Sequence, residues 1–232
     1  MNYLSVGVDA KTRKGEKKGV LTGILYMSPA QAAGGKTMCP FSTSECRAVC
    51  LNTAGRGAFD MVQKARIRKT REFQLDPKAF VDKLREDVRL LISQAAKRGM
   101  IPAVRLNGTT DIEWEKYGII QDFPDVQFYD YTKYPPTMRA NLPPNYHLTF
   151  SYSEAKHSPT WAMGWLARGV NTAVVFNQTL PDTFQTIPVI NGDESDLRFT
   201  DPKGVIVGLK TKGKARSADV GPGHFVQLGK AA

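Results

Sequence analysis

Short apolar segments alternate along this chain with helical segments or long loops, and this alternation limits the possible folds more than any other feature. Strands that are separated by helices are typical of a mostly parallel sheet. The sequence therefore predicts an α/β fold, a single domain in which that sheet forms a partial, open α/β barrel. We expect strands at residues 20–27, 101–106, 126–131, 147–152, 172–176, 187–190 and 205–209.

Helix signals are clearest between the first two strands. Residues 59–73 form a basic segment with helical spacing, and Asp76-Pro77 is a strong helix start because Asp is a favoured N-cap and Pro suits the first turn. Apolar residues then recur at helical spacing as far as Gly99, a favoured residue just beyond a helix end. A shorter helix is expected at 158–169.

Length and composition are those of an ordinary globular domain. The chain has 232 residues, of which 41% are hydrophobic and 23% charged, and one domain of this size can bury a good core. We expect the ends, residues 1–18 and 226–232, to be the loosest parts. No apolar run approaches the length of a membrane span, and the N-terminus is polar and basic, so we expect a cytoplasmic protein.

The only three cysteines of the chain, Cys39, Cys46 and Cys50, fall within twelve residues. In a reducing compartment, clustered cysteines usually indicate metal binding or catalysis, and an odd number argues against a closed set of disulfides. Three thiolates can bind three irons of a [4Fe–4S] cluster and leave the fourth iron open. Zinc held by three cysteines and one histidine is an alternative, and so are three unrelated buried thiols.

Polar residues follow every predicted strand, at the edge where parallel α/β folds collect their sites. Arg105, in an apolar strand, can clamp a carboxylate or phosphate. Asp111 and Asp130 can act as acid or base, and Lys133 can neutralise Asp130; a plain ion pair is the alternative. We expect a cavity that faces the open iron and is lined by Arg105, Asn107, Asp111, Asp130 and Lys133.

A fourth ligand could come from elsewhere in the chain. His147, His157 and His224 are candidates, and His157 has the most polar neighbours. Glu45 lies inside the cysteine loop and could also bind iron, although a solvated acid is the simpler interpretation.

Positive charge is the other marked property of the composition. Lys and Arg number 32 against 22 Asp and Glu, for a net charge of +10. The excess is concentrated at residues 11–18, 64–71 and 203–216. Such a surface attracts polyanions, so nucleic acid is a possible partner, while solubility alone would also explain the charge.

Four stretches of the chain resemble the bacteriophage family known as "gene product 88": CPFSTSECRAVCLNTAGR, VRLNGTTDIEWE, FYDYTKYP and GDESDLRFTDPKGVIVGLKTKG. This resemblance implies a phage origin, hence the cytoplasm of an infected bacterium, but no particular reaction. A more distant likeness is to radical S-adenosylmethionine enzymes, which also place a three-cysteine loop after the first strand of a partial barrel. Here the spacing is C-x6-C-x3-C instead of C-x3-C-x2-C, and Asn107-Gly108-Thr109 stands where a Gly-Gly-Glu stretch is usual.

Three functions follow from these features. The first is an enzyme that uses the open iron as a Lewis acid or redox centre on a small or nucleotide-like molecule. The second is a basic nucleic-acid-binding protein whose metal site, a cluster or zinc, is structural or senses redox state. The third is a radical enzyme with S-adenosylmethionine as cofactor. The sequence leaves open which of them applies, and whether the protein is an enzyme.

Overall fold

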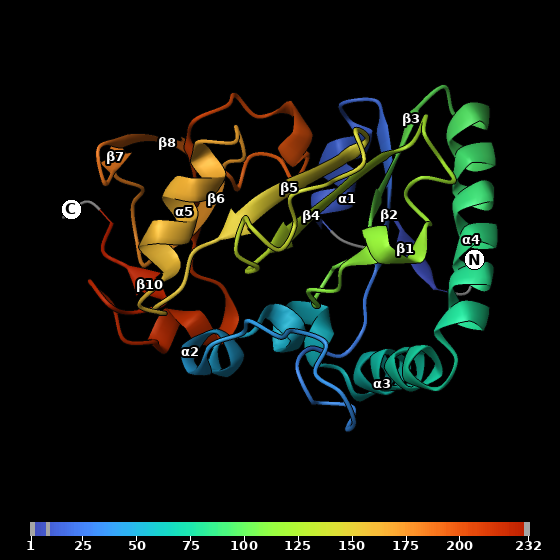
Figure 1. Cartoon of the computed structure of the whole chain (residues 1–232), viewed down its shortest axis with the longest axis horizontal. Helices are drawn as coiled ribbons and strands as arrows, with labels where there is room; N and C mark the ends of the chain where they lie inside the picture. The colour runs from blue at the N-terminus through green and yellow to red at the C-terminus, as the bar shows by residue number, and fades with distance from the viewer. Residues whose placement is uncertain (1–2, 8–9, 230–232) are drawn as a thin grey trace.

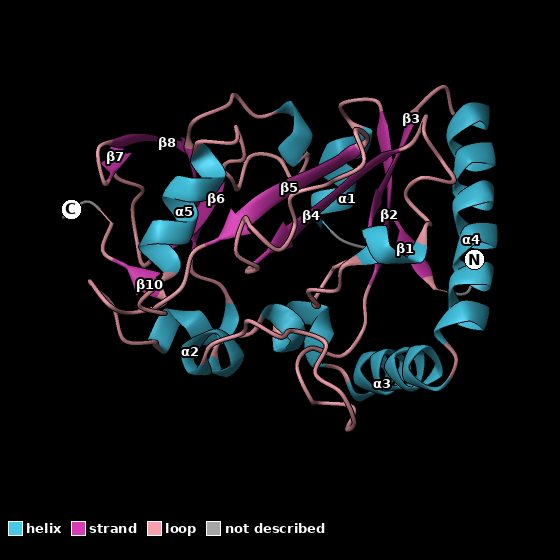
Figure 2. Ribbon diagram, viewed as in Figure 1, coloured by secondary structure: helices cyan, strands magenta, loops and turns pink. Residues whose placement is uncertain are grey.

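A mostly parallel sheet forms the centre of the protein in the computed structural model, which describes residues 3–7 and 10–229 (Figures 1 and 2). Its order across the described residues is β1-β2-β3-β4-β5-β6-β9-β8-β7, and β10 also pairs with β6. The strands are β1 Leu4–Val6, β2 Val20–Leu25, β3 Ile101–Arg105, β4 Gln127–Thr132, β5 Tyr146–Ser151, β6 Thr172–Phe176, β7 Thr183–Phe184, β8 Ile187–Asn191, β9 Ile206–Lys210 and β10 Val226–Gln227.

The parallel arrangement confirms the α/β fold expected from the alternation of segments. All pairs from β2 to β8 along this order are parallel, and only the edge pairs β1–β2 and β7–β8 are antiparallel. Each strand expected from the sequence is present, with small shifts in its ends. The order ends on β1 and β7, so the strand pairing of the described residues is that of an open sheet rather than a closed one.

The two long helices lie between β2 and β3 in sequence. Asp76 caps the second of them through a 2.9 Å hydrogen bond from the backbone N–H of Ala79 to its Oδ1, and Gly99 beyond its end has a φ of +61°. The α-helices are α1 Ala10–Glu16, α2 Ser44–Ala48, α3 Asp60–Leu75, α4 Pro77–Lys97 and α5 Ser158–Leu166. Short 3₁₀ helices occur at η1 Leu51–Thr53, η2 Gly55–Ala58, η3 Trp114–Tyr117, η4 Arg198–Thr200 and η5 Gly213–Ser217.

The sheet has two faces with different partners. One packs its apolar side chains against α4 and α5 to form the main core, which includes Leu84, Leu91, Phe128 and Trp165. We call the opposite side the second face. It carries a smaller apolar group of Val20, Ala103, Tyr129 and Leu197, with η4 packed against β5. Because side chains alternate along a strand, Tyr129 and Tyr131 of β4 lie on the second face while their neighbours lie in the main core.

Both ends of the described chain join the sheet. β1 pairs with β2, and the carboxylate of Asp87 on α4 accepts hydrogen bonds from the backbone N–H groups of Tyr3 (2.7 Å) and Leu4 (2.9 Å). β10 pairs with the carboxyl end of β6, beyond the stretch where β6 pairs with β5. Residues 1–2, 8–9 and 230–232 of the ends expected to be loose lie outside the described residues.

The longest helix, α4, carries charged residues throughout its sequence. None of the helices in the described ranges has the length and apolar character needed to cross a bilayer.

Removing the α4 cap gives a direct test of how this helix begins. Asp76→Ala leaves the Ala79 N–H without its side-chain acceptor, so we expect the free energy of unfolding to fall by about 1 kcal/mol. Urea denaturation measures it. Asp125→Ala, at an exposed loop carboxylate, is the matched control and should change the stability by less than about 0.5 kcal/mol. Equal effects of the two substitutions would contradict the capping role.

Candidate functional site

The three thiols meet beside the carboxyl ends of the parallel strands. Cys39 lies in the loop after β2, Cys46 lies in α2 and Cys50 follows α2 closely, and all three are partly buried. Burial is the main reason that the pKa of the Cys39 thiol is raised to about 12, and the nearby Asp111, Cys50 and Cys46 groups contribute. The thiols therefore lie within electrostatic range of one another, although eleven positions of chain separate the outer two.

Two cations lie beside Cys50. Burial raises the pKa of the Cys50 thiol, while Arg66 on α3 and Lys133 after β4 lower it. Arg66 is buried and donates two 2.6 Å hydrogen bonds to Asn52, one to its backbone oxygen and one to Oδ1. Lys133 Nζ donates to the backbone oxygen of Ser151 at 3.0 Å and to its Oγ at 2.9 Å. Both cations are thus bonded to neutral groups, next to sulfur atoms that could carry negative charge.

Residues after β5 fix the start of α2. Thr43 is the N-cap of this helix, and its Oγ1 accepts a hydrogen bond from the backbone N–H of Cys46 and donates one of 2.7 Å to Glu154 Oε2. Glu154 Oε1 accepts a 3.0 Å bond from the backbone N–H of Glu45. The short helix that carries Cys46 is therefore attached to the edge of the sheet through a single carboxylate.

The C-terminal segment closes the other side of α2 (Figure 1). Glu45 Oε1 lies 2.9 Å from His224 Nδ1, and Glu45 Oε2 accepts a 2.7 Å bond from the backbone N–H of Phe225. That backbone bond is the main reason that the pKa of Glu45 is lowered. Val49, just before Cys50, packs with Ala215 and Val226 in a small apolar cluster.

Backbone groups also reach the sulfur atoms. The N–H of Ala30 donates to Cys39 Sγ at 3.3 Å, and Cys39 Sγ lies 3.8 Å from the backbone oxygen of Thr109. The N–H of Asn52 bonds to Cys50 and lowers its pKa. Ala30 has a φ of +46°, a left-handed conformation that is unfavourable for alanine and persists where the surroundings fix it. Hydrogen bonds to sulfur are one of the means by which proteins tune iron–sulfur clusters.

The spacing of the donors bears on which metal group could bind here. Within residues 3–7 and 10–229, no three His, Cys, Asp or Glu side chains are close enough together to hold one metal ion. A single zinc ion brings all its ligand atoms to about 2.0–2.3 Å from one centre. Thiolates that each bind a different iron of a cubane are farther apart. The described side chains therefore form no ready-made site for a single metal ion.

Of the five residues expected to line a cavity, Asp111 and Lys133 lie near the thiols. Asp111 Oδ2 accepts a 2.7 Å bond from the backbone N–H of Lys133, and the N–H of Asp111 donates to the backbone oxygen of Met38 at 2.8 Å. Asp111 thereby connects the loop after β3 to the residue before Cys39 and to the end of β4. Lys133 pairs with this carboxylate through its backbone and directs its ammonium group toward Ser151.

Asn107 is a buried hydrogen-bonding centre of the loop after β3. Its backbone N–H donates to Asp130 at 2.7 Å, and its Nδ2 donates to the backbone oxygen of Ile112 at 2.9 Å. Its Oδ1 accepts three further bonds, from Thr110 Oγ1, from the backbone N–H of Ile112 and from Trp114 Nε1. With its polar atoms used in this way, Asn107 fixes the shape of the loop that leads to Asp111.

Asp130 is fully buried in the main core side of β4. Besides the bond from Asn107, its Oδ2 accepts a 2.8 Å bond from the hydroxyl of Tyr146. Tyr146 is in turn 3.3 Å from Arg139, whose guanidinium makes bonds of 2.8 and 2.6 Å to the carboxylate of Glu115. The structure therefore places Asp130 in an internal polar network beneath the site, apart from the thiols.

Arg105 lies on the second face. Its NH1 is 3.1 Å from Asp196 Oδ2 in a nearly buried ion pair, and its guanidinium carbon is 4.9 Å from the centre of the Tyr131 ring. The charge in this apolar strand is therefore paired within the protein, with Asp196. Arg105 and Asn107 thus belong to two different sides of the sheet.

The three histidines have separate environments. His147 lies on β5 near Arg198 and Lys203, and its pKa is lowered to about 4, mainly by burial. His157 packs against Trp161, with ring centres 3.6 Å apart. Only His224 contacts the cysteine helix, through Glu45, so it is the histidine that the fold brings nearest to this loop in the described contacts.

Sequence reasoning does not name Arg66 or Glu154 among the site residues, and the structure places both around the thiols. Arg66 lies inside a run of basic residues, where nothing in the pattern distinguishes a buried cation from exposed ones. Glu154 follows a predicted strand, and this position is a signal that could have identified it. Its bond to α2 depends on a short helix that the sequence pattern does not predict.

Comparisons with known proteins give one match. A protein-family model described as "Gene product 88" covers residues 4–221. Neither the curated proteins nor the solved structures contain a match to the chain. The likeness to radical S-adenosylmethionine enzymes gains no support from these comparisons.

The buried Asp130 carboxyl predicts a particular pH dependence of stability. Burial is the main cause that raises its pKa from 3.8 to about 7 in the folded protein. Between these values the folded state holds a proton that the unfolded state has lost, so stability falls as pH rises through this interval. Asp130→Asn should flatten that fall in urea denaturation series, whereas the exposed Asp125→Asn should leave it unchanged. An unaltered slope in Asp130→Asn would refute the assignment.

Proposed function

Since the chain belongs to the phage gene product 88 family, which is named for a gene product rather than for an activity, we propose its function from the site itself. It is an iron–sulfur protein that holds a [4Fe–4S] cluster on Cys39, Cys46 and Cys50, with the fourth iron open toward polar residues. One observation carries the proposal: all three cysteines of the chain come together beside two cations, Arg66 and Lys133, whose hydrogen bonds go to neutral groups.

Charge balance supports the presence of a metal centre. Buried thiols stay protonated, and metal binding replaces their protons and makes them thiolates. In the protein alone, Arg66 and Lys133 donate hydrogen bonds to neutral groups. A thiolate at Cys50 would place negative charge beside these two cations. The backbone N–H groups of Ala30 and Asn52 would stabilise two of the thiolates.

The function that fits best is an enzyme acting on a small or nucleotide-like molecule. The cluster would supply Lewis-acid or redox chemistry at its open iron. Asp111, which accepts a bond from the Lys133 backbone and acts electrostatically on Cys39, would hold or release a proton there. Asn107 and Asp130 position the loop that carries Asp111 rather than touching a substrate.

Two further features complete the proposal. The sheet would curve as a partial barrel, which would turn the second face inward toward the substrate. The protein would work in the cytoplasm of the infected host, where thiols remain reduced before they bind metal.

Single cysteine substitutions test the ligand set. Protein prepared without oxygen should be brown and contain roughly four irons and four sulfides per chain. Cys39→Ala, Cys46→Ala and Cys50→Ala should each lose most of the iron and the visible absorption, because each removes the only protein ligand to one iron. Absorption spectra with iron, sulfide and zinc analysis measure this outcome.

Ser42→Ala is a matched control in the same loop and should keep the cluster. Iron retained at wild-type level in all three cysteine variants would contradict the proposal. One zinc ion and no sulfide per chain would show that the cysteines hold a structural zinc site instead of a cluster. Binding of S-adenosylmethionine to the reduced protein, with its cleavage, would move the reaction to the radical class.

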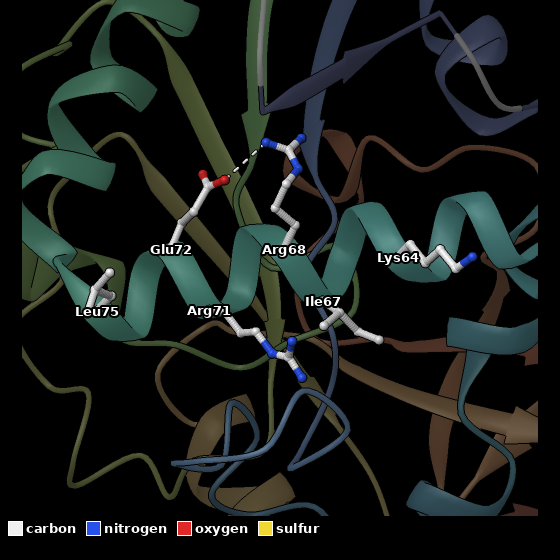
Figure 3. A pocket seen from close by; sticks show the side chains of 6 residues that line it. All are labelled: Lys64, Ile67, Arg68, Arg71, Glu72 and Leu75. Atoms are coloured by element: carbon white, nitrogen blue, oxygen red, sulfur yellow. Dashed lines mark hydrogen bonds and ion pairs between the residues drawn. The ribbon is translucent and has the colours of Figure 1, made fainter.

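A second function is favoured by the outer side of α3. Lys64, Arg68 and Arg71 project from this helix around a shallow pocket, and Arg68 also pairs with Glu72 at 3.0 Å (Figure 3). Phe59, just before the helix, is 61% exposed. Exposed cations with an exposed aromatic ring can bind the phosphates and bases of single-stranded nucleic acid. In this alternative the metal site would be structural or would sense redox state.

Salt dependence distinguishes this alternative. If α3 binds nucleic acid, the double substitution Lys64→Ala with Arg68→Ala should weaken binding and reduce the slope of log affinity against log salt by about 1.4 on a single strand, about 0.7 for each lost phosphate contact. Fluorescence anisotropy with a labelled single strand measures the slope. The pair Lys78→Ala with Lys83→Ala, on α4, is the control of equal charge. Absence of salt-sensitive binding by the wild type would remove this function.

A further inference from the structure

A row of polar atoms without hydrogen-bond partners crosses the second face of the sheet. It consists of Arg105 Nε on β3, the Tyr131 hydroxyl on β4 and Thr149 Oγ1 on β5, all buried and unpartnered in the described part of the chain. Tyr131 and Thr149 are register partners on adjacent strands. The Arg105 guanidinium carbon lies 4.9 Å from the centre of the Tyr131 ring. These three groups therefore form one continuous set.

Such a set is unusual in a folded protein. Nearly all buried polar atoms have partners, and each buried polar atom left without one costs about 1–3 kcal/mol. Thr149 is fully buried, with 0% of its surface exposed. Three unpartnered groups on neighbouring strands are explained most simply by a ligand that bonds to them.

The row leads to the thiols. Lys133 and Ser151 lie two residues beyond Tyr131 and Thr149, so they continue the same face of β4 and β5 toward the carboxyl edge. Lys133 Nζ and Ser151 Oγ are 2.9 Å apart, and Lys133 acts electrostatically on Cys50. The unpartnered row and the cysteine site are thus parts of one surface.

The charges around this surface favour an anion. Arg105 is balanced by Asp196, but Arg66 and Lys133 bond to neutral groups. A [4Fe–4S]²⁺ core with three thiolates would carry one negative charge, so Arg66 and Lys133 together would leave one positive charge in excess. Arg66 also lies 4.9 Å over the ring of Tyr26, which interacts electrostatically with Arg105, so Arg66 is connected to the row through Tyr26.

We infer that this surface binds a small ligand with an anionic group, a carboxylate or a phosphate. Arg66 and Lys133 hold the anionic group beside Cys50, and Arg105, Tyr131 and Thr149 bond to the polar body of the ligand. The statement that this ligand is a substrate rests on the proposed function. The statement that the anion binds here depends only on the five protein side chains just named.

Two substitutions remove the unpartnered hydroxyls with little change of shape, Tyr131→Phe and Thr149→Val. A hydroxyl kept for a ligand contributes nothing to the stability of the free protein, so the melting temperature should stay the same or rise. The affinity for succinate, whose second carboxylate stands in for the polar body of the ligand, should fall about tenfold in each variant, as expected for a lost hydrogen bond to a charged ligand. The affinity for phosphate, which only Arg66 and Lys133 would hold, should stay at the wild-type value.

Thr172→Val is the matched control. Thr172 is also fully buried with an unpartnered hydroxyl, but its register partners Phe150 and Ile206 place it on the main core side of the sheet. Its substitution should leave anion binding unchanged. A loss of affinity in this variant equal to that in Thr149→Val would attribute the effect to general loosening and overturn the inference.

The probes are inorganic phosphate and succinate, titrated against chloride at constant ionic strength. Specific binding raises the melting temperature in a saturable way and is confirmed by calorimetry. The anion with the larger saturable shift identifies the ligand group. The inference fails if neither anion stabilises the protein beyond chloride, or if Tyr131→Phe and Thr149→Val bind succinate as the wild type does.

Metal analysis of the same samples separates this inference from the proposed function. Titrations use both the iron-loaded protein and chelator-treated protein. Anion binding that depends on Tyr131 in a protein that never takes up iron would support this site and reject the cluster. A loaded cluster without any anion-specific shift would do the reverse.

Discussion

Parallel pairing of β2, β3, β4, β5 and β6 is the constraint on which the rest of the structure depends. It directs the carboxyl end of each strand to the same edge, so loops that are far apart in the sequence lie beside the cysteine segment. Met38 therefore bonds to Asp111 across the ends of the neighbouring strands β2 and β3, and Thr43, after β2, bonds to Glu154, after β5. None of these contacts could form if the strands ran in alternating directions.

The internal network of Asn107, Asp130, Tyr146 and Arg139 makes this edge rigid. Its members are buried and bonded to one another, and buried groups of this kind fix one arrangement because any displaced partner loses its bond. Asp111 follows directly from the loop that Asn107 holds. Rigidity beneath the site is what allows the short cysteine segment above it, with few core contacts of its own, to keep a defined geometry.

Much of the fold could be predicted from the sequence because its signals are local. The Asp76-Pro77 start of α4 and the apolar runs of the central strands are written in consecutive residues. The site could be predicted only in part. Polar strand ends indicated Asp111 and Lys133, which the structure places near the thiols. Periodicity does not show which face of β3 packs against which covering segment. Arg105 therefore lies opposite Asp196, and Arg66 is found beside Cys50 by the packing of α3 alone.

The contact between Glu45 and His224 joins positions that are 179 residues apart. During synthesis the three cysteines leave the ribosome well before the segment that closes over them. Their surroundings are consequently complete only when β10 has entered the sheet beside β6. Closing a loop of this length costs conformational entropy. Contacts between residues so far apart in the sequence also form late in folding. Any metal centre at these cysteines would accordingly mature as one of the final events of folding, on a chain whose sheet has already formed.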